Sequence, residues 1–321
     1  MKAALLDFRG TALAALFTVL ALTTGCVAFG LPGHPPPGVK VIRDLAYVPG
    51  GDAAQVLDLY LPEQDSSKPL PLFVWIHGGG WMGGSKDGPY GLDLVGRGYA
   101  VASVEYRFSQ KAIFPAQIQD CQAAIRWLRA NSKVYNLDPK HIAVGGASAG
   151  GHLVALLGTA GGKRAFVPVG GNEKQSDRVQ AVLDLFGPSD FSAVMSQAAA
   201  DPTKSVFNFN HGDPYSLLIG VPLGSDKAKE LAVSPIHYVS KDNPPFLVLH
   251  GTADSLVPFE QSVELCDALH TVRVEAILQR FTGAGHGGPA FDQPAVRKLV
   301  QDFLDKHLRG AAVKVEAIPG T

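Results

Sequence analysis

The feature that most constrains the fold of this chain is one serine set among very small residues. The stretch AVGGASAGGHL, residues 143–153, surrounds Ser148 with four glycines and three alanines. Glycine destabilises the interior of a helix or strand by roughly 0.5–1 kcal/mol relative to alanine, so this density needs a structural cause. Either the backbone turns sharply at this point, or another group approaches it closely.

The flanking residues favour a sharp turn. A short strand pattern, HIAVGG, precedes Ser148, and a helical pattern follows it. Residues 146–150, GASAG, match the G-x-S-x-G elbow, a strand-to-helix corner so tight that side chains two positions either side of the serine would collide. Such a corner raises the hydroxyl above the sheet and aims the helix N-terminus at it. The motif in this context predicts Ser148 as a catalytic nucleophile.

Apolar runs rich in β-branched and aromatic residues recur along the chain, bounded by turn residues. They cover Val39–Val48, Val56–Leu61, Pro71–Ile76, Ala100–Glu105, His141–Val144, Val179–Phe186, Pro245–His250 and Val272–Phe281. Helical patterns contain Ile118, Cys121, Ile125 and Leu128, and cover His152–Leu157, Gln261–Leu269 and Pro294–His307. Two hairpin-like strands followed by alternating strands and helices predict an α/β fold. We expect an eight-stranded, mostly parallel sheet flanked by helices, with its ligand site beyond the carboxyl ends of the strands.

A serine hydroxyl needs a base to accept its proton. In folds with this elbow the chain order is nucleophile, acid, histidine, which leaves the histidines after Ser148. His286 follows the last strand within FTGAGHGG, a loop of small residues that can carry an imidazole over the sheet, so we predict that His286 is the base. We interpret His152, on the elbow helix, as structural, and His250 as strand-end packing.

The acid that orients the base is expected on the loop after the preceding strand. Asp254, in HGTADSLVP, lies there, and its carboxylate would hold the imidazole tautomer and stabilise the imidazolium. Asp184 and Asp190, in LDLFGPSDF, are the rival acids. We expect these two to bond a turn instead.

The strand LFVWI runs into HGGGW, residues 77–81. Glycines let backbone N–H groups face a substrate oxygen with no Cβ in the way, so Gly79, Gly80 and Ala149 are predicted to form the oxyanion hole. A glycine-rich loop can also cradle phosphate, but no G-K-[ST] follows, which excludes a P-loop.

Both ends of the chain differ from its centre. Lys2 and Arg9 precede an uncharged apolar run that ends at Cys26, and we read residues 1–26 as a secretory signal too short to span a bilayer comfortably. LTTGC resembles a bacterial lipoprotein site with threonine where leucine is usual, so Cys26 is a candidate for lipidation. Plain cleavage and an uncleaved anchor are the alternatives. We expect an exported protein, either periplasmic, membrane-anchored through Cys26 or secreted.

The remaining chain divides by composition. Residues 27–38 are expected to be a Pro-rich linker, 39–309 the catalytic domain, 192–233 a small lid insertion and 310–321 a tail. Within the lid, Phe207 and Phe209 are candidate substrate contacts, as is Trp81 beside the oxyanion loop. All three have packing as the alternative.

The 321-residue chain is 46% hydrophobic and 18% charged with a formal net charge of −1, as in soluble globular proteins. With no clustered Lys/Arg run, nucleic acid is not expected as a partner. We expect Cys121 and Cys266 to be buried free thiols, with a disulfide as the alternative.

Together, HGGGW, VEYR, NLDPKHIAVGGASAGGHL, LFGPSDF and GAGHGG carry a resemblance that extends from Val39 to Leu308. The chain is similar to the α/β-hydrolases that include bacterial feruloyl/acetyl-xylan (BD-FAE-like) esterases and hormone-sensitive-lipase-like carboxylesterases. The resemblance implies an α/β-hydrolase fold, no cofactor and no metal. By matching motif it assigns Ser148, Asp254 and His286 the roles of nucleophile, acid and base, and Gly79, Gly80 and Ala149 those of oxyanion donors.

The relatives include acetyl, feruloyl and short-chain esterases and an aryl-formamide hydrolase, so the resemblance leaves the substrate open. We expect an exported serine esterase that cleaves short-acyl or aromatic esters, either small molecules or esters linked to polysaccharide. The alternatives are an amide or formamide hydrolase with the same triad and a non-catalytic binding protein on this scaffold.

Overall fold

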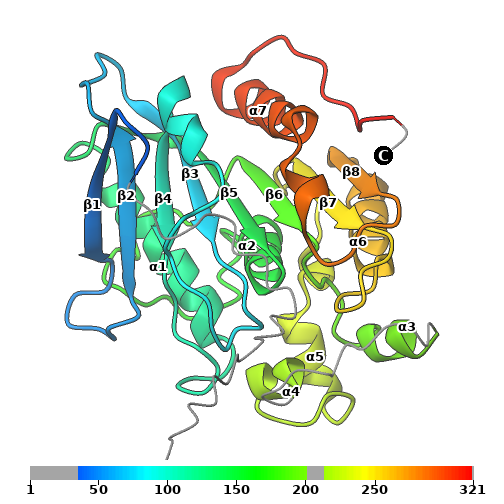
Figure 1. Cartoon of the computed structure of the whole chain (residues 1–321). Coiled ribbons are helices and arrows are strands. Elements are labelled where there is room, and N and C mark those ends of the chain that lie inside the picture. The colour runs from blue at the N-terminus through cyan, green and yellow to red at the C-terminus, as the bar shows by residue number, and fades with distance from the viewer. Residues whose placement is uncertain (1–34, 201–212, 320–321) are drawn as a thin grey trace, which may run out of the picture.

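The computed structural model describes residues 35–200 and 213–319 and arranges them around one central sheet (Figure 1). Its strands are β1 (Val39–Ala46), β2 (Val56–Pro62), β3 (Leu70–Ile76), β4 (Ala100–Val104), β5 (Leu137–Ala147), β6 (Ala181–Leu185), β7 (Phe246–Gly251) and β8 (Ala276–Phe281). Their order is β1-β2-β4-β3-β5-β6-β7-β8. β2 pairs antiparallel with β1 and β4, and every later pair is parallel. The predicted eight-stranded, mostly parallel sheet is confirmed.

Helices cover both faces of this sheet. They are α1 (Ala116–Ala130), α2 (Ala149–Ala160), α3 (Val194–Ala200), α4 (Pro214–Ile219), α5 (Lys227–Val233), α6 (Glu260–Thr271) and α7 (Pro294–Arg309), with three short 3-10 helices at Leu92–Arg97, Pro235–Tyr238 and Pro289–Asp292. Because strand side chains alternate between faces, β3 contributes to two cores. Val74 and Ile76 join the core containing α1, α2 and α6, whereas Phe73 and Trp75 join the core under α7.

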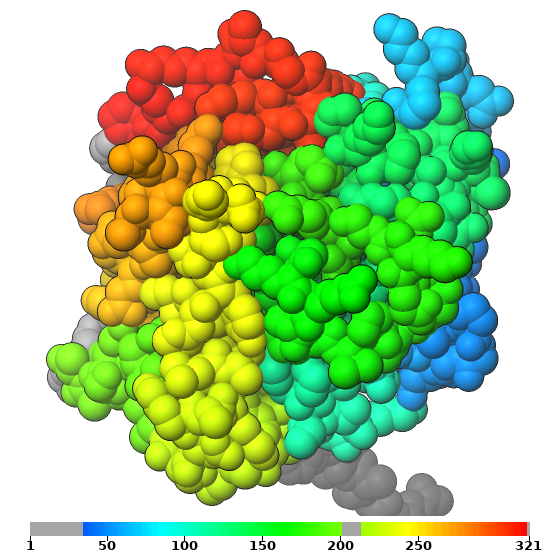
Figure 2. Space-filling model, turned by 180° about the vertical axis from the view of Figure 1, so that it is seen from behind, coloured from blue at the N-terminus to red at the C-terminus, as the bar shows by residue number. Residues whose placement is uncertain are grey.

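The segment between β6 and β7, predicted as a lid insertion, carries α3, α4 and α5 in its described parts. These helices gather at one end of the sheet (Figure 1). Seen from behind, the α4–α5 part lies beside the residues that follow β4 (Figure 2), where Phe114 N–H donates to the Leu218 carbonyl oxygen at 2.8 Å. Phe207 and Phe209 lie outside the described residues.

Other differences from the sequence patterns are local. The last strand begins at Ala276 rather than Val272, because α6 runs to Thr271 and the chain then turns through Arg273 at φ 64°. Cys121 and Cys266 are buried and free, as predicted. Residues 1–26, including Cys26, lie outside the described part, and within that part no helix has the length and apolarity needed to cross a membrane.

Candidate active site

Ser148 occupies a strained corner between β5 and α2. Its backbone has φ 57° and ψ −119°, a conformation that costs a non-glycine residue free energy and that concentrates at functional sites. A Cβ on Gly146 would stand 2.4 Å from the Gly150 carbonyl oxygen, and one on Gly150 would stand 2.1 Å from that of Ile76. Gly146 and Gly150 therefore allow a close approach of backbone to backbone, whereas Gly145 and Gly151 leave room for the side chains of Phe73 and Asp184.

Three side chains distant in sequence form one hydrogen-bonded line at this corner. Ser148 Oγ lies 2.9 Å from His286 Nε2, and His286 Nδ1 lies 2.6 Å from Asp254 Oδ2. The Nδ1–H donates to the carboxylate, so Nε2 is left to accept the serine proton. The structure thus brings together the three residues that the motifs singled out.

Two loops are joined to make this line. Asp254 follows β7, His286 follows β8, and Ala253 N–H donates to the Ala284 carbonyl oxygen at 2.9 Å. A Cβ on Gly251, the last residue of β7, would stand 2.3 Å from that same carbonyl oxygen. Gly251 therefore allows the histidine loop to cross closely over the end of β7.

Asp254 is fully buried and accepts four hydrogen bonds. Oδ1 accepts from the backbone N–H groups of Leu256 and Val257 at 2.8 and 2.9 Å, while Oδ2 accepts from both His286 and His250, the latter at 3.1 Å. Burial on its own would raise the pKa of Asp254, but His286, together with the bond from His250, holds this pKa well below its ordinary value. The carboxylate is therefore charged and fixed.

His250 does more than pack at a strand end, so that interpretation of the sequence was wrong. Its Nδ1 lies 2.6 Å from the Ser262 hydroxyl, and its Nε2–H is directed at Asp254 Oδ2 and the Val257 carbonyl oxygen. His250 precedes Asp254 by four residues, but His250 lies at the end of β7 and Asp254 in the loop that follows. No periodic pattern in the sequence revealed the contact.

The glycines of HGGGW form a loop beside Ser148. Gly79 and Gly80 have φ values of 111° and 62°, in the region that favours glycine. A Cβ on Gly79 would stand 2.2 Å from the Gly83 carbonyl oxygen, and one on Gly78 would stand 3.3 Å from Ser148 Cβ. The loop thus passes directly against the elbow, next to Ala149 at the start of α2.

His77 anchors the start of this loop. Its Nδ1–H donates to the Gly78 carbonyl oxygen at 2.7 Å, and its Nε2 lies 2.9 Å from Glu105 Oε1. The ring is therefore held at both of its nitrogens. The Tyr106 ring stacks on His77 at 4.5 Å.

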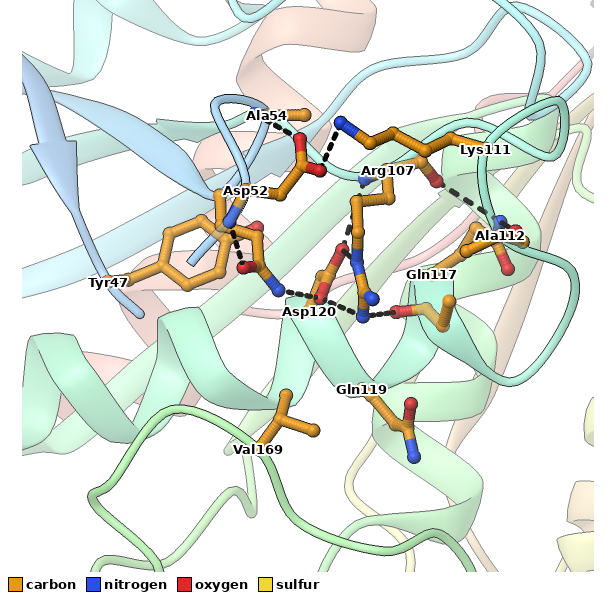
Figure 3. Close-up of polar contacts among 12 residues, drawn as sticks. Tyr47, Asp52, Ala54, Arg107, Lys111, Ala112, Gln117, Gln119, Asp120 and Val169 are labelled. Atoms are coloured by element: carbon orange, nitrogen blue, oxygen red, sulfur yellow. Dashed lines mark hydrogen bonds and ion pairs between the residues drawn. The ribbon is translucent and has the colours of Figure 1, made fainter. Parts of the chain in front are cut away.

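A polar network supports the same loop from the β4–α1 connection (Figure 3). Asp120, buried on α1, accepts from the Arg107 backbone N–H and from its guanidinium at 2.7–3.0 Å. Gln55 also donates to Asp120, and Lys111 pairs with Asp52. These contacts fix the β4–α1 connection. From it, the Ser109 N–H donates to the Trp81 carbonyl oxygen at 2.8 Å.

A hollow of about 270 Å³ opens to solvent beside the serine. Its lining is Gly80, Trp81, Ser148, Ala149, Pro188, Pro214, Tyr215, Leu256 and Val257. Trp81 is only 2% exposed, so most of its ring packs in the core while one part reaches the hollow. Tyr215 was missed by sequence reasoning, because nothing in the insertion before β7 marks which residue returns to the elbow.

The side chains that we interpreted as structural have structural partners. Asp184 Oδ1 accepts from Gly187 N–H, and Asp190 Oδ1 accepts from Ser192, so both bond turns as expected. His152 accepts from the Trp81 indole N–H and donates to the Val233 carbonyl oxygen. Across residues 35–200 and 213–319, no cluster of three or more His, Cys, Asp or Glu side chains could hold a metal ion.

Comparison with known proteins now identifies the group to which this site belongs. The family model BD-FAE matches residues 57–269. The chain belongs to the BD-FAE family. Esterase LipC of Mycobacterium tuberculosis is 31% identical over 294 residues, which are 87% of this chain and 70% of LipC.

Two solved structures share the fold of this BD-FAE member. A truncated carbohydrate esterase from gut microbiota has a TM-score of 0.73 at 29% identity, covering 84% of this chain and 96% of its own. Esterase Est2 of Thermogutta terrifontis with propionate bound has a TM-score of 0.66 at 25% identity, covering 87% and 97%. The chain is a carboxylic ester hydrolase with the α/β-hydrolase fold.

Proposed function

We propose that Ser148, His286 and Asp254 are the catalytic triad of an esterase that cleaves short-acyl esters. Ser148 Oγ attacks the ester carbonyl carbon while His286 Nε2 takes the hydroxyl proton. The imidazolium returns that proton to the leaving alcohol as the carbon–oxygen ester bond breaks, which leaves an acyl group on Ser148. Water, activated by the same histidine, then releases the carboxylic acid.

The tetrahedral intermediate carries a negative oxygen, and the N–H groups of Gly79, Gly80 and Ala149 are proposed to receive it. Loss of one such donor typically lowers turnover by about 10²–10³. Asp254, charged and fixed by four hydrogen bonds, would hold the His286 tautomer and stabilise the imidazolium. The observation that supports this function most is the unbroken hydrogen-bonded line from Asp254 through His286 to Ser148.

The test is hydrolysis of p-nitrophenyl acetate by Ser148→Ala, with Ser66→Ala, a half-buried serine on the β2–β3 connection, as the matched control. We expect Ser148→Ala to lower kcat by about 10⁶-fold, as in comparable triads, and Ser66→Ala to leave it unchanged. A fluorophosphonate probe should label the wild type and not Ser148→Ala. Normal hydrolysis by folded Ser148→Ala would refute the assignment.

Of the acetyl and feruloyl types of ester, free or linked to polysaccharide, we propose the acetyl type as the natural substrate. The gut-microbiota relative is a carbohydrate esterase and Est2 holds propionate, which supports a short acyl group on a carbohydrate alcohol. Comparing acetylated xylan with methyl ferulate tests this choice directly. Activity on methyl ferulate alone would contradict the short-acyl assignment.

We also propose that the chain is exported and carries lipid on Cys26. The charged start, the apolar run and LTTGC support this proposal. Cells fed a radioactive fatty acid should label the wild type but not Cys26→Ser. An unlabelled mature wild-type protein would end the lipidation proposal.

A further inference from the structure

The hollow beside Ser148 can be assigned to either the acyl half or the alcohol half of the ester substrate. This step rests on the proposed esterase function. The leaving alcohol oxygen must receive its proton from His286 Nε2, so the alcohol half lies on the side of that ring. His286 is not among the residues that line the hollow, whereas Gly80 and Ala149 are. The hollow therefore takes the acyl half of the substrate.

Two aromatic rings close the inner side of this hollow. Trp81 and Tyr215 both line it, yet they are only 2% and 3% exposed. Their rings meet edge to face, with centroids 5.4 Å apart, and Phe191 packs against both at 5.7 and 5.0 Å. Rings that are almost fully buried but still border the hollow form its end wall rather than its entrance.

Trp81 is held in place at its backbone and at its ring. Its φ of 57° is unusual for a bulky residue, and its carbonyl oxygen accepts from Ser109 N–H. Its indole Nε1–H donates to His152 Nδ1 at 3.2 Å. The end wall therefore cannot swing aside without breaking a buried hydrogen bond.

His152 links this wall to two other elements. It lies in the first turn of α2, directly after the elbow, and its Nε2–H donates to the carbonyl oxygen of Val233 at the end of α5 at 2.7 Å. The side chain is completely buried, and burial lowers its pKa to about 4, so Nδ1 keeps the lone pair that Trp81 requires. One neutral imidazole thus joins the oxyanion loop, the elbow helix and the insertion before β7.

We infer that Trp81 is the specificity-determining residue that limits the acyl group to small aliphatic chains, and that His152 is the positioning residue that holds it there. Acetyl and propionyl groups are the acyl groups that this hollow takes between Ser148 and the Trp81 ring. The two nearly buried rings of Trp81 and Tyr215 set how far an acyl chain can extend from Ser148. The wall therefore favours an acetyl-type over a feruloyl-type acyl group.

The test compares kcat/KM for p-nitrophenyl acetate, butyrate and octanoate, which share one alcohol. Wild type should prefer acetate, and Trp81→Leu should raise the octanoate-to-acetate ratio by at least about tenfold, since each methylene newly buried contributes roughly fourfold. His152→Gln should raise the ratio by a smaller factor while acetate hydrolysis persists. Trp127→Leu, on the far part of α1 against Tyr135, is the matched control and should leave the ratio unchanged.

A ratio that stays at the wild-type value in folded, acetate-active Trp81→Leu would overturn the inference. If Trp81→Leu does not fold, Tyr215→Leu removes the other ring of the same wall, and an unchanged ratio there overturns the inference equally. A change of ratio in His152→Gln separates positioning from simple structural support, because a general loss of stability lowers all three rates together. Failure of the proposed function is distinct, since it would appear as activity retained by Ser148→Ala.

Discussion

Replacing Asp184 with asparagine should change how the stability of this protein depends on pH. Asp184 lies on β6 beside Gly146 of the elbow strand, and a Cβ on Gly151 of α2 would meet its Oδ1 at 2.4 Å. Oδ1 accepts from Gly187 N–H at 2.9 Å, whereas Oδ2 has no hydrogen-bond partner among the described residues. Complete burial raises the pKa of this carboxyl to about 7 from its ordinary 3.8.

The size of the effect follows from that pKa. At 1.36 kcal/mol per pH unit, a rise from 3.8 to about 7 corresponds to about 4 kcal/mol. The folded state keeps a proton that the unfolded state has already lost, so this contribution to stability is complete below pH 3.8 and is lost as pH rises to about 7. His152 opposes it, because its pKa, lowered to about 4, makes stability increase with pH between about 4 and 6.5.

Asp184→Asn keeps the acceptor for Gly187 but remains neutral at every pH. Its amide N–H groups would replace Oδ2, which has no hydrogen-bond partner among the described residues, and would be buried without an acceptor. This should lower the free energy of unfolding by about 1–3 kcal/mol at pH 4.5. Toward pH 8 the variant no longer carries the cost of burying a charge, so its stability should approach or exceed that of the wild type. Urea denaturation at pH 4.5, 6, 7 and 8 measures the difference, in which the contribution of His152 cancels. A difference that is constant across this range would refute the reasoning.

Three further changes test the supports of the site. His250→Gln removes the second histidine bond to the proposed triad acid and should lower kcat/KM by about 10–100-fold, the typical worth of a hydrogen bond to a charged group; unchanged kinetics would contradict that role. Gly251→Ala forces a Cβ against the Ala284 carbonyl oxygen of the histidine loop, so both esterase activity and melting temperature should fall. Gly96→Ala, where a Cβ meets no atom within 4 Å, should change neither. Asp120→Asn weakens the hold on Arg107 and should lower the free energy of unfolding by about 2 kcal/mol in urea titrations; an unaltered titration would show that the network is dispensable.

Much of the site could be predicted from local patterns. Gly146 and Gly150 indicate the elbow because a side chain on either would collide with backbone nearby. For Gly146 that backbone is Gly150, and for Gly150 it is Ile76 at the end of the neighbouring strand β3. Asp254 and His286 could be selected because parallel strands bring the loops at their carboxyl ends to one edge of the sheet. Each of these inferences depends on position relative to a strand end, which apolar runs bounded by turn residues indicate.

Other features of the site were decided by packing alone. Trp81 and His152 are 71 residues apart, and His152 and Val233 are 81 apart, so no period or motif announces their hydrogen bonds. The role of His250 depends on which carboxylate oxygen its ring meets, and Tyr215 borders the hollow only because the insertion before β7 folds back onto the elbow.

By itself, then, the sequence determined the sheet, the elbow and the selection of Ser148, Asp254 and His286 as the residues that meet at it. Short-range backbone sterics and strand order dictate these features. The shape of the hollow, the wall that ends it and the second histidine on Asp254 were decided only by the tertiary structure. These depend on side chains from separate elements meeting in one close-packed interior, where distance in space bears no fixed relation to distance along the chain.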